Sequence, residues 1–379
     1  MSLCSEADWA NLEKYHRVLG ISGLGEFSHN ELDKALAGKM ASVFMGMSRD
    51  YDYMSGFSTV KDLETMFQLT YLYFTDIRKD EKNFAMFNNM AENELKNRDL
   101  EPSTIFNDSV SLTLGSHNWR SRPFTIESLK QMDYDRILQM AKERTANAAE
   151  YTFFFVGNFD EAVIRPLIEQ YIASLPGKKG TKPNWVNYDN KPNGVVINHF
   201  TRKMEEPKAY ASIYWYNKEM PYSLENDIKA DLLGRVLDKI YMQKIREDVG
   251  AAYTTSARGW ASTLGDANFT AINAECPFKP EFAETALQIL NDEPLVACKT
   301  IDAASLEDFK EMLLKNHQTY VKENWYWVHV LTDYVDQGVD YYTDYEDIVR
   351  AQTPESIAAF ARQLMSAGNK VEVVMTPAE

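Results

Sequence analysis

The hydrophobic and polar positions in the first 175 residues follow mainly the pattern of amphipathic helices. Apolar side chains recur with a period near 3.6 over residues 5–19, where Trp9 and Leu12 share one side. Ser28 followed by Glu31 predicts a capping box that starts a short helix. Further helices are predicted at residues 58–74, 81–98, 102–114, 125–148 (with a break near 132) and 161–175.

Strands are predicted where apolar, β-branched and aromatic residues alternate or form short runs between turn residues. In the first half these segments are residues 39–48, 51–57 and 151–156, the last expected to be a buried strand. In the second half, strands are predicted at residues 194–200, 209–216, 253–259, 267–275 and 370–375, and helices at residues 223–246, 280–295, 305–324, 325–338 and 353–365. The mixture of the two periodicities predicts an α+β protein.

A change of composition near the middle of the chain predicts a domain boundary. Residues 176–193 are rich in Pro, Gly, Lys and Asn and poor in apolar residues, as linkers are. A length of 379 residues also suggests about two or three domains. We therefore predict one αβ domain over residues 1–176, a linker over 177–193 and a second αβ domain over 194–379.

The C-terminal parts of the two predicted domains have similar sequences that align without a gap. A shift of 220 positions pairs similar residues, namely Leu129 with Val349, Ile137 with Ile357, Ala141 with Ala361 and Phe153 with Val373. The same shift places the helix of residues 5–19 over residues 225–239. An internal duplication explains the match, and generic αβ patterning remains the alternative.

The duplication, if real, has a structural consequence for the first domain. The strands predicted at residues 194–200 and 209–216 have counterparts that fall before residue 1. We therefore expect the chain to start inside a domain, and the first domain to lack its opening strands. A missing strand leaves an exposed sheet edge that invites pairing or aggregation.

Composition and charge narrow the classes of function. The contents of 45% hydrophobic and 25% charged residues are ordinary for a globular protein. The net charge of −16, without any long basic run, argues against nucleic acid as a partner, because phosphate binding needs clustered Lys and Arg. The apolar run at residues 151–156 is far too short to span a bilayer. The three cysteines are widely spaced and predict no disulfide framework.

The histidines do not form a zinc-binding pattern. A catalytic zinc site needs three protein ligands and an open position for water. No two of the six histidines lie within four residues of each other, and neither H-E-x-x-H nor H-x-x-E-H occurs. We therefore predict no metal site in this chain, and a site assembled from distant residues is the alternative. No G-x-S-x-G motif occurs either, so no nucleophile or general base is predicted. His317, His329 and the Trp325-Tyr326-Trp327 cluster are predicted to be packing residues, His117 a loop residue and Cys276 an inert buried thiol.

The stretch 244–253 places an arginine and a tyrosine on either side of a glycine. Gly250 makes one unbroken helix improbable, so Arg246 is expected in the last turn of a helix and Tyr253 at the start of a strand. The two side chains then converge on one cleft, where they can bind a carbonyl or a charged intermediate. The alternative is an ion pair of Arg246 with Asp248 or Glu247 and an ordinary strand tyrosine.

Residues 246–253 read R-E-x-x-G-x-A-Y, which resembles a signature of the pitrilysin/insulinase family of zinc metallopeptidases. Residues 28–39, 55–64 and 155–160, the last followed by Leu175-Pro176, resemble the third domain of this family. The resemblance covers nearly the whole chain, and these segments occur in the order that the family has them. The resemblance implies a LuxS/MPP-like metallohydrolase fold: two similar αβ domains with mostly antiparallel sheets and helices packed on one face.

The same resemblance implies a function. The family has four similar domains in two halves that close around a peptide, and this chain resembles the C-terminal half. The zinc site, with H-x-x-E-H, belongs to the N-terminal half, so no cofactor is expected in this chain and the chain alone is expected to be inactive. Tyr253 would hydrogen-bond the substrate carbonyl as it becomes an oxyanion, and Arg246 would hold the peptide or orient the tyrosine.

The expected partners are therefore the N-terminal half and a peptide substrate. Neither nucleic acid nor a membrane span is expected, and the bacterial periplasm or cell envelope is a guess from the family. A non-catalytic structural subunit and a pure peptide-binding module share this fold and remain alternatives. Retention of both Arg246 and Tyr253 favours the enzyme half, because a structural subunit has no need of the pair.

Overall fold

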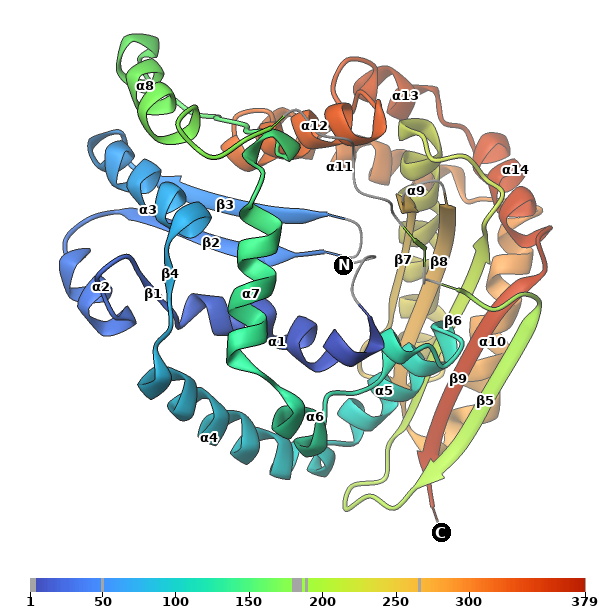
Figure 1. Cartoon of the computed structure of the whole chain (residues 1–379). Coiled ribbons are helices and arrows are strands. Elements are labelled where there is room, and N and C mark those ends of the chain that lie inside the picture. Colours follow the sequence, from blue (N-terminus) through green and yellow to red (C-terminus); the bar gives the residue numbers. More distant parts are fainter. Residues whose placement is uncertain (1–4, 49–50, 179–185, 188–189, 265–266, 379) are drawn as a thin grey trace. The chain divides into compact units, whose positions relative to one another are not determined.

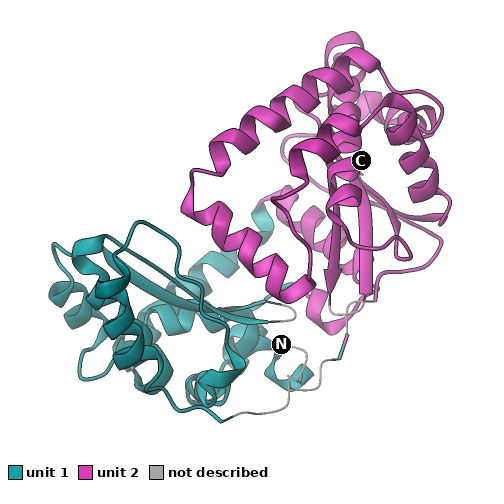
Figure 2. Ribbon diagram, turned by 90° about the horizontal axis from the view of Figure 1, so that it is seen from above, with its two compact units in different colours: residues 1–100, 123–186 teal, residues 101–122, 187–379 magenta. Residues whose placement is uncertain are grey.

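The chain folds into two compact units, which are described separately here. The computed structural model describes residues 5–48, 51–178, 186–187, 190–264 and 267–378. Unit 1 comprises the described parts of residues 1–100 and 123–186, and unit 2 those of residues 101–122 and 187–379 (Figure 2). Residues 179–185 and 188–189, in the predicted linker, lie outside the described residues.

Unit 2 is built on a five-stranded sheet with the strand order β5-β9-β6-β8-β7 (Figure 1). The β5–β9 pair is parallel, and the other three pairs are antiparallel, as the predicted fold class requires. The strands are β5 (Val195–Arg202), β6 (Ala209–Asn217), β7 (Ser256–Leu264), β8 (Ala267–Phe278) and β9 (Asn369–Pro377).

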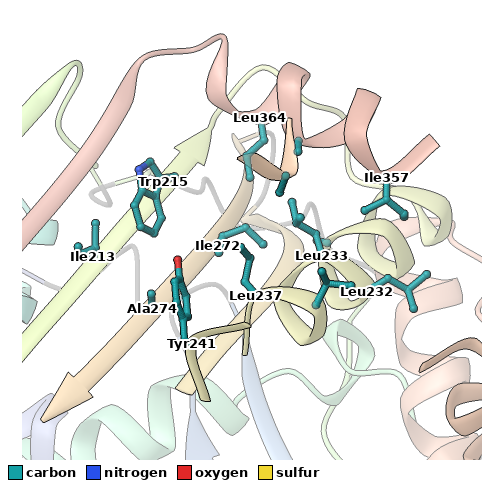
Figure 3. Packing of buried hydrophobic residues seen from close by; sticks show 14 of the residues in the cluster. Ile213, Trp215, Leu232, Leu233, Leu237, Tyr241, Ile272, Ala274, Ile357 and Leu364 are labelled. Atoms are coloured by element: carbon teal, nitrogen blue, oxygen red, sulfur yellow. The ribbon is translucent and has the colours of Figure 1, made fainter. Parts of the chain in front are cut away.

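Helix α9 (Leu224–Tyr241) packs its apolar side on one face of this sheet. It begins where the side chain of Ser223 accepts a hydrogen bond from the backbone of Asn226. Apolar residues at helical spacing, among them Leu233 and Leu237, are fully buried against Ile272 and its neighbours (Figure 3). The other helices of the unit are α10 (Ala283–Ala297), α11 (Ala303–Tyr320), α12 (Asn324–Gln337), α13 (Tyr345–Ala351) and α14 (Pro354–Met365).

Two glycines let α9 approach β7 closely. A Cβ atom on Gly234 would lie 2.3 Å from the backbone nitrogen of Gly259, and one on Gly259 would lie 2.0 Å from the carbonyl oxygen of Ala230. No other residue type fits at either position without moving the backbone. The close contact fixes the end of α9 relative to the start of β7, and these are the two segments that carry the predicted site.

Helix α5 (Pro102–Leu114) covers the opposite face of the same sheet. Its Phe106 and Val110 are buried in a cluster with Val373 and Met375 of β9. In sequence this helix lies within the predicted first domain, and its apolar pattern carries no sign of its packing partner. The domain boundaries predicted from the linker stay a prediction.

Unit 1 contains a smaller sheet, the antiparallel pair of β2 (Ala41–Met47) and β3 (Asp52–Ser58). The core beneath it joins Met45 to Tyr15, Leu19 and Ile137. A second, two-residue pair joins β1 (Gly23–Leu24) to β4 (Ile77–Arg78). The helices are α1 (Trp9–Gly20), α2 (His29–Ala35), α3 (Leu63–Thr75), α4 (Glu81–Asn97), α6 (Ile126–Gln131), α7 (Tyr134–Thr145) and α8 (Glu161–Leu167).

The two halves of the chain repeat much of the same order of elements. The shift of 220 carries α7 onto α14 at both ends, and it carries the start of α3 onto the start of α10. Ile137 and Ile357 are both fully buried, as are Ala141 and Ala361. Generic αβ patterning does not explain agreement of helix ends and of buried positions, so the structure favours the duplication.

The prediction of a buried strand at residues 151–156 is wrong. The residues form no strand and are only partly buried. The corresponding strand of unit 2, β9, pairs with β5 and β6, and the described residues of unit 1 contain no counterpart of either. The correspondence of Phe153 with Val373 under the shift of 220 is also off by one residue. Phe153 packs on Phe74 of α3, whereas Val373 faces α5 on the opposite side of its sheet, and successive residues of a strand face opposite sides.

Candidate functional site

The helix that carries Arg246 changes its geometry just before the site. α9 continues without a break into a π-helical segment, Met242–Asp248, of seven residues. Such segments are rare and often lie at functional sites, because the wider turn redirects the side chains that follow. Arg246 lies in the last turn of this segment, as predicted, and the π geometry is a feature that the sequence did not indicate.

Two contacts to α10 hold the π-helical segment in place. The hydroxyl of Tyr241, which is fully buried, donates a hydrogen bond of 2.9 Å to the carbonyl oxygen of Leu290. The Nζ atom of Lys244 lies 2.6 Å from Oε1 of Glu293, whose side chain is 8% exposed. Because Ile245 is also fully buried, the opposite side of the segment, with Arg246, faces solvent.

A turn at Gly250 then brings the chain back toward the sheet. Gly250 has a φ of +66°, a conformation that residues with a side chain rarely adopt. The N–H of Ala251 donates to the carbonyl oxygen of Ile245 at 2.9 Å. Lys279, just after β8, holds the turn with two hydrogen bonds. Its Nζ donates to the carbonyl oxygen of Gly250 at 3.0 Å, and its backbone N–H donates to the carbonyl oxygen of Ala251 at 2.9 Å.

Tyr253 does not lie in a strand, so this part of the prediction is wrong. β7 begins at Ser256, and Tyr253 lies in the bend that precedes it. The β-pairing of Ala252 with Phe278 is an isolated bridge, and the chain leaves the edge of β8 before the regular ladder starts. The tyrosine side chain is therefore 87% exposed instead of packed on a sheet face.

The predicted convergence of Arg246 and Tyr253 is present in the structure. The guanidinium carbon of Arg246 lies 5.6 Å from the centre of the Tyr253 ring, within the range of a cation–π contact. Nη1 of Arg246 also lies 3.3 Å from the sulfur of Met242. At an exposed site such a contact stabilises by about 0.5–1 kcal/mol, enough to favour one arrangement of two long side chains.

The alternative ion pair of Arg246 with Asp248 or Glu247 is absent from the described part of the chain. The carboxylate of Asp248 instead accepts a hydrogen bond of 2.9 Å from Nε2 of Gln243. The hydroxyl of Tyr253 has no hydrogen-bond partner among the described residues. Within the described part of the chain, the site thus presents a guanidinium without a carboxylate partner and a phenolic donor without an acceptor, both available to a ligand.

A half-buried carboxylate, that of Asp238, fixes the start of β7, close after Tyr253. Oδ1 of Asp238 on α9 accepts a hydrogen bond of 2.9 Å from the backbone N–H of Ala257. Burial raises the pKa of the Asp238 carboxyl above its ordinary value, partly offset by that hydrogen bond and by Arg235. Together with Lys279, this contact limits the positions open to Tyr253, and neither residue was indicated by the sequence pattern.

The remaining candidate residues have structural roles. His317 is buried, and its Nε2 lies 2.9 Å from the hydroxyl of Tyr326, as a packing histidine would. The side chain of His329 is 56% exposed, but its ring lies 5.6 Å from that of Tyr341, so the predicted packing role is met in part. His117 lies in an exposed loop after α5. Burial raises the pKa of the Cys276 thiol to about 12, which agrees with an inert thiol.

The three aromatic residues at the start of α12 are divided between core and surface. Tyr326 is buried in the main cluster, Trp327 is partly buried against it, and Trp325 is 53% exposed. Within the described residues, no group of three or more His, Cys, Asp or Glu side chains could hold a metal ion. No helix in the described part of the chain has the length and apolar character needed to cross a membrane.

Residues 132–313 match a family model described as the peptidase M16 inactive domain. The predicted resemblance to zinc metallopeptidases is thereby confirmed. A zinc protease PQQL-like protein from Arabidopsis thaliana is 23% identical over 292 residues, which cover 70% of this chain and 29% of that protein. The chain thus spans less than a third of this curated relative.

Solved structures agree with this fold. The crystal structure of the periplasmic protease PqqL from Escherichia coli has a TM-score of 0.84 at 19% identity, covering 99% of this chain and 41% of that one. The first half of the same protease, solved separately, also matches, with a TM-score of 0.72 at 12% identity, covering 99% of this chain and 84% of that one. At such identities the likeness concerns the fold alone.

Proposed function

We propose that this chain is the half of a zinc peptidase that binds the peptide substrate and assists its hydrolysis at a zinc site carried by another half. The observation that carries the proposal is the exposed pair of Arg246 and Tyr253: among the described residues the guanidinium has no carboxylate partner and the phenol has no hydrogen-bond partner. The match to an inactive M16 domain supports it, because such a domain accompanies zinc proteases.

The role proposed for Tyr253 is to stabilise developing negative charge. When a peptide carbonyl is attacked, its oxygen becomes an oxyanion, and a fixed donor aimed at that oxygen lowers the barrier. The phenolic O–H of Tyr253 is such a donor, and its 87% exposure allows it to reach a substrate outside its own unit. Removing one donor of this kind typically costs about 2.7–4 kcal/mol, or a factor of about 10²–10³ in kcat.

The role proposed for Arg246 is to hold the peptide and to position the tyrosine. A guanidinium carries five N–H donors and binds carbonyl or carboxylate oxygens in a fixed geometry. Since Arg246 has no carboxylate partner among the described residues, binding a substrate does not require it to break an ion pair. Its place over the Tyr253 ring also restricts the directions in which the phenol points.

The described residues do not fit a zinc ion. A catalytic zinc needs three protein ligands, and no group of three suitable side chains lies together in the described part of the chain. Water activation is therefore assigned to the H-x-x-E-H-containing half, and no step through zinc is assigned to this chain. The peptide substrate and that half are the proposed partners.

The experiment combines this chain with an H-x-x-E-H-containing half from the same organism and follows cleavage of a quenched fluorescent peptide. We expect activity only for the combination, and a loss of about 10²–10³ in kcat for Tyr253→Phe. Tyr334→Phe is the matched control, because Tyr334 on α12 is also well exposed, at 60%, and lies outside the site. Equal rates for Tyr253→Phe and the control would refute the assisting role.

The same mixture separates the alternatives. A combination that binds peptide without cleaving it would indicate a peptide-binding module, and one that forms a stable complex with neither binding nor cleavage would indicate a structural subunit. The proposed compartment is the periplasm, in line with the description of the E. coli relative as a periplasmic protease. Fractionation of the native host with an antibody against this chain tests that compartment.

A further inference from the structure

The sulfur of Met242 lies against the guanidinium of Arg246. Nη1 of Arg246 donates a hydrogen bond of 3.3 Å to this sulfur, and the guanidinium carbon lies 5.6 Å from the centre of the Tyr253 ring. A thioether is a weak acceptor, so the sulfur holds the arginine only loosely. Neither the binding of a peptide nor the orientation of Tyr253 requires this contact, which leaves the role of the sulfur open.

The π-helical turn places Met242 and Arg246 side by side on the solvent side of the segment. Hydrogen bonds in such a turn join residues five positions apart, so residues four apart lie nearly one above the other. Tyr241 and Ile245 form one pair of this kind, and both are fully buried. Met242 and Arg246 form the next pair, with Met242 partly exposed and Arg246 exposed. Small solutes in water can therefore reach both side chains.

Exposure and a charged neighbour occur together at Met242. The sulfur of Met45 also accepts a hydrogen bond, of 3.7 Å from the hydroxyl of Tyr15, but Met45 is only 2% exposed. Met90 on α4 is 70% exposed and has no polar partner among the described residues. A chemical change at the sulfur of Met242 would thus alter the surroundings of Arg246, whereas the same change at Met90 would not.

We propose that Met242 is a site of reversible oxidation by hydrogen peroxide, and that its sulfoxide holds Arg246 away from Tyr253 and from a peptide. A lone pair of the sulfur attacks one peroxide oxygen, and the O–O bond breaks. The proton on the attacked oxygen passes to the leaving hydroxide, which becomes water. The thioether is oxidised to the sulfoxide by two electrons, and the peroxide is reduced by the same two.

The sulfoxide changes the balance of contacts around the guanidinium. Its S=O oxygen is a strong acceptor, and a hydrogen bond to a charged group stabilises more than an exposed cation–π contact does. Arg246 has no carboxylate partner among the described residues that would compete for it. The arginine therefore stays on the sulfoxide, and Tyr253 loses the contact that restricts its directions. The effect on a peptide rests on the proposed function, whereas the hold on Arg246 does not.

The test treats the whole chain with dilute hydrogen peroxide, removes the peroxide with catalase, and locates sulfoxides by mass spectrometry. The reactivity of each arginine is then followed with phenylglyoxal. We expect oxidation of Met242 alongside the exposed Met90, and slower modification of Arg246 by roughly fivefold to tenfold. Arg165 on α8, whose side chain is 68% exposed, is the internal reference and is expected to keep its rate. A methionine sulfoxide reductase should restore the rate at Arg246.

Three substitutions assign the effect to one sulfur. Met242→Leu removes the sulfur and keeps an apolar side chain of similar volume, so peroxide should no longer change the reactivity of Arg246. Met242→Gln offers a carbonyl oxygen near the position of the sulfoxide oxygen, so Arg246 should react slowly without any peroxide. Met90→Leu is the matched control, and it should respond to peroxide as the unchanged chain does.

Three results would overturn the proposal. Met242 stays reduced under conditions that oxidise Met90, or Arg246 reacts at an unchanged rate once Met242 is a sulfoxide, or Met242→Leu responds to peroxide as the unchanged chain does. All three are read on this chain alone and do not need a zinc-binding half.

Cleavage is a separate readout, in which the oxidised chain, freed of peroxide, is combined with an untreated H-x-x-E-H-containing half. We expect slower cleavage of the fluorescent peptide, reversed by the reductase. An active combination whose rate ignores the sulfoxide would overturn the link to the peptide. A combination that is inactive before oxidation would contradict the proposed function instead, and the reactivity of Arg246 would still decide whether Met242 controls it.

Discussion

Replacing Gly250 by alanine tests the turn that brings Arg246 and Tyr253 together. The φ of +66° at Gly250 lies in the left-handed region, and a Cβ atom built there has no other atom within 4 Å. The substitution therefore adds backbone strain without a steric clash. The turn cannot relax easily, because Lys279 holds the carbonyl oxygens of both Gly250 and Ala251.

The expected loss follows from two opposing terms. A left-handed conformation costs a residue with a Cβ roughly 1–2 kcal/mol. Replacing glycine also removes conformational freedom from the unfolded chain, which stabilises the protein by about 0.4–1 kcal/mol. The net expectation for Gly250→Ala is a loss of about 0.5–1 kcal/mol. For a domain of 150–250 residues this corresponds to roughly 1–4 °C in the melting temperature.

The assay is thermal unfolding followed by circular dichroism, with amide exchange of residues in unit 2 as a second measure. Gly250→Asn is expected to lose less than Gly250→Ala, because asparagine tolerates the left-handed region better. Gly20→Ala is the control of opposite sign. Gly20 ends α1 with open space around it and without a positive φ, so alanine there is expected to stabilise by about 0.5–1 kcal/mol.

The reasoning is refuted if Gly250→Ala stabilises the chain as Gly20→Ala does. In that case the left-handed turn does not set the path from Arg246 to Tyr253. A loss of several kcal/mol would also contradict it, because the open space around Gly250 leaves no clash to account for such a value.

Three further predictions concern the core of unit 2. Burial raises the pKa of Asp227, so its ionised form is costly in the folded state and the protein loses stability as the pH rises and this carboxyl ionises. Asp227→Asn can still accept the hydrogen bond from the N–H of Ala261. It should therefore raise the melting temperature near neutral pH, and raise it less near pH ~4. Cys276, with its pKa raised to about 12, should resist alkylation by iodoacetamide in the native chain and react after unfolding, as mass spectrometry would detect. Gly234→Ala should destabilise by about 1–3 kcal/mol or more in chemical denaturation, because its Cβ would lie 2.3 Å from the backbone of Gly259; a neutral result would contradict the close packing of α9 on β7.

Local chemistry made several elements in the first half of the chain predictable. Ser28 and Glu31 form the predicted capping box, and the helix at residues 102–114 has the predicted ends. In these cases the signal lies within a few residues of the feature it determines. The segment 151–156 shows the limit of such signals, because its aromatic run has the composition of a strand but a strand also needs a neighbour.

Some features of the candidate site were likewise predictable from the sequence, and others were not. The sequence placed Arg246 at a helix end and put a turn at Gly250, and both are present in the structure. It did not indicate the π-helical geometry of residues 242–248, the anchoring of Lys244 on Glu293, or the support from Lys279. Each of these depends on a partner about 30 to 50 residues away, or on helix geometry that propensity does not specify.

By itself the sequence determined the α+β class and the identity of the two side chains that converge, and it indicated the shift of 220 between the two halves of the chain. These depend on the spacing of residue types along the chain, which periodicity and glycine placement reveal directly. Tertiary structure alone decided that α5 covers the sheet of unit 2, that Tyr253 is exposed ahead of β7, and that residues 152–156 pair with no strand among the described residues. Pairing and burial are properties of two segments at once, and the pattern within one segment does not specify the other.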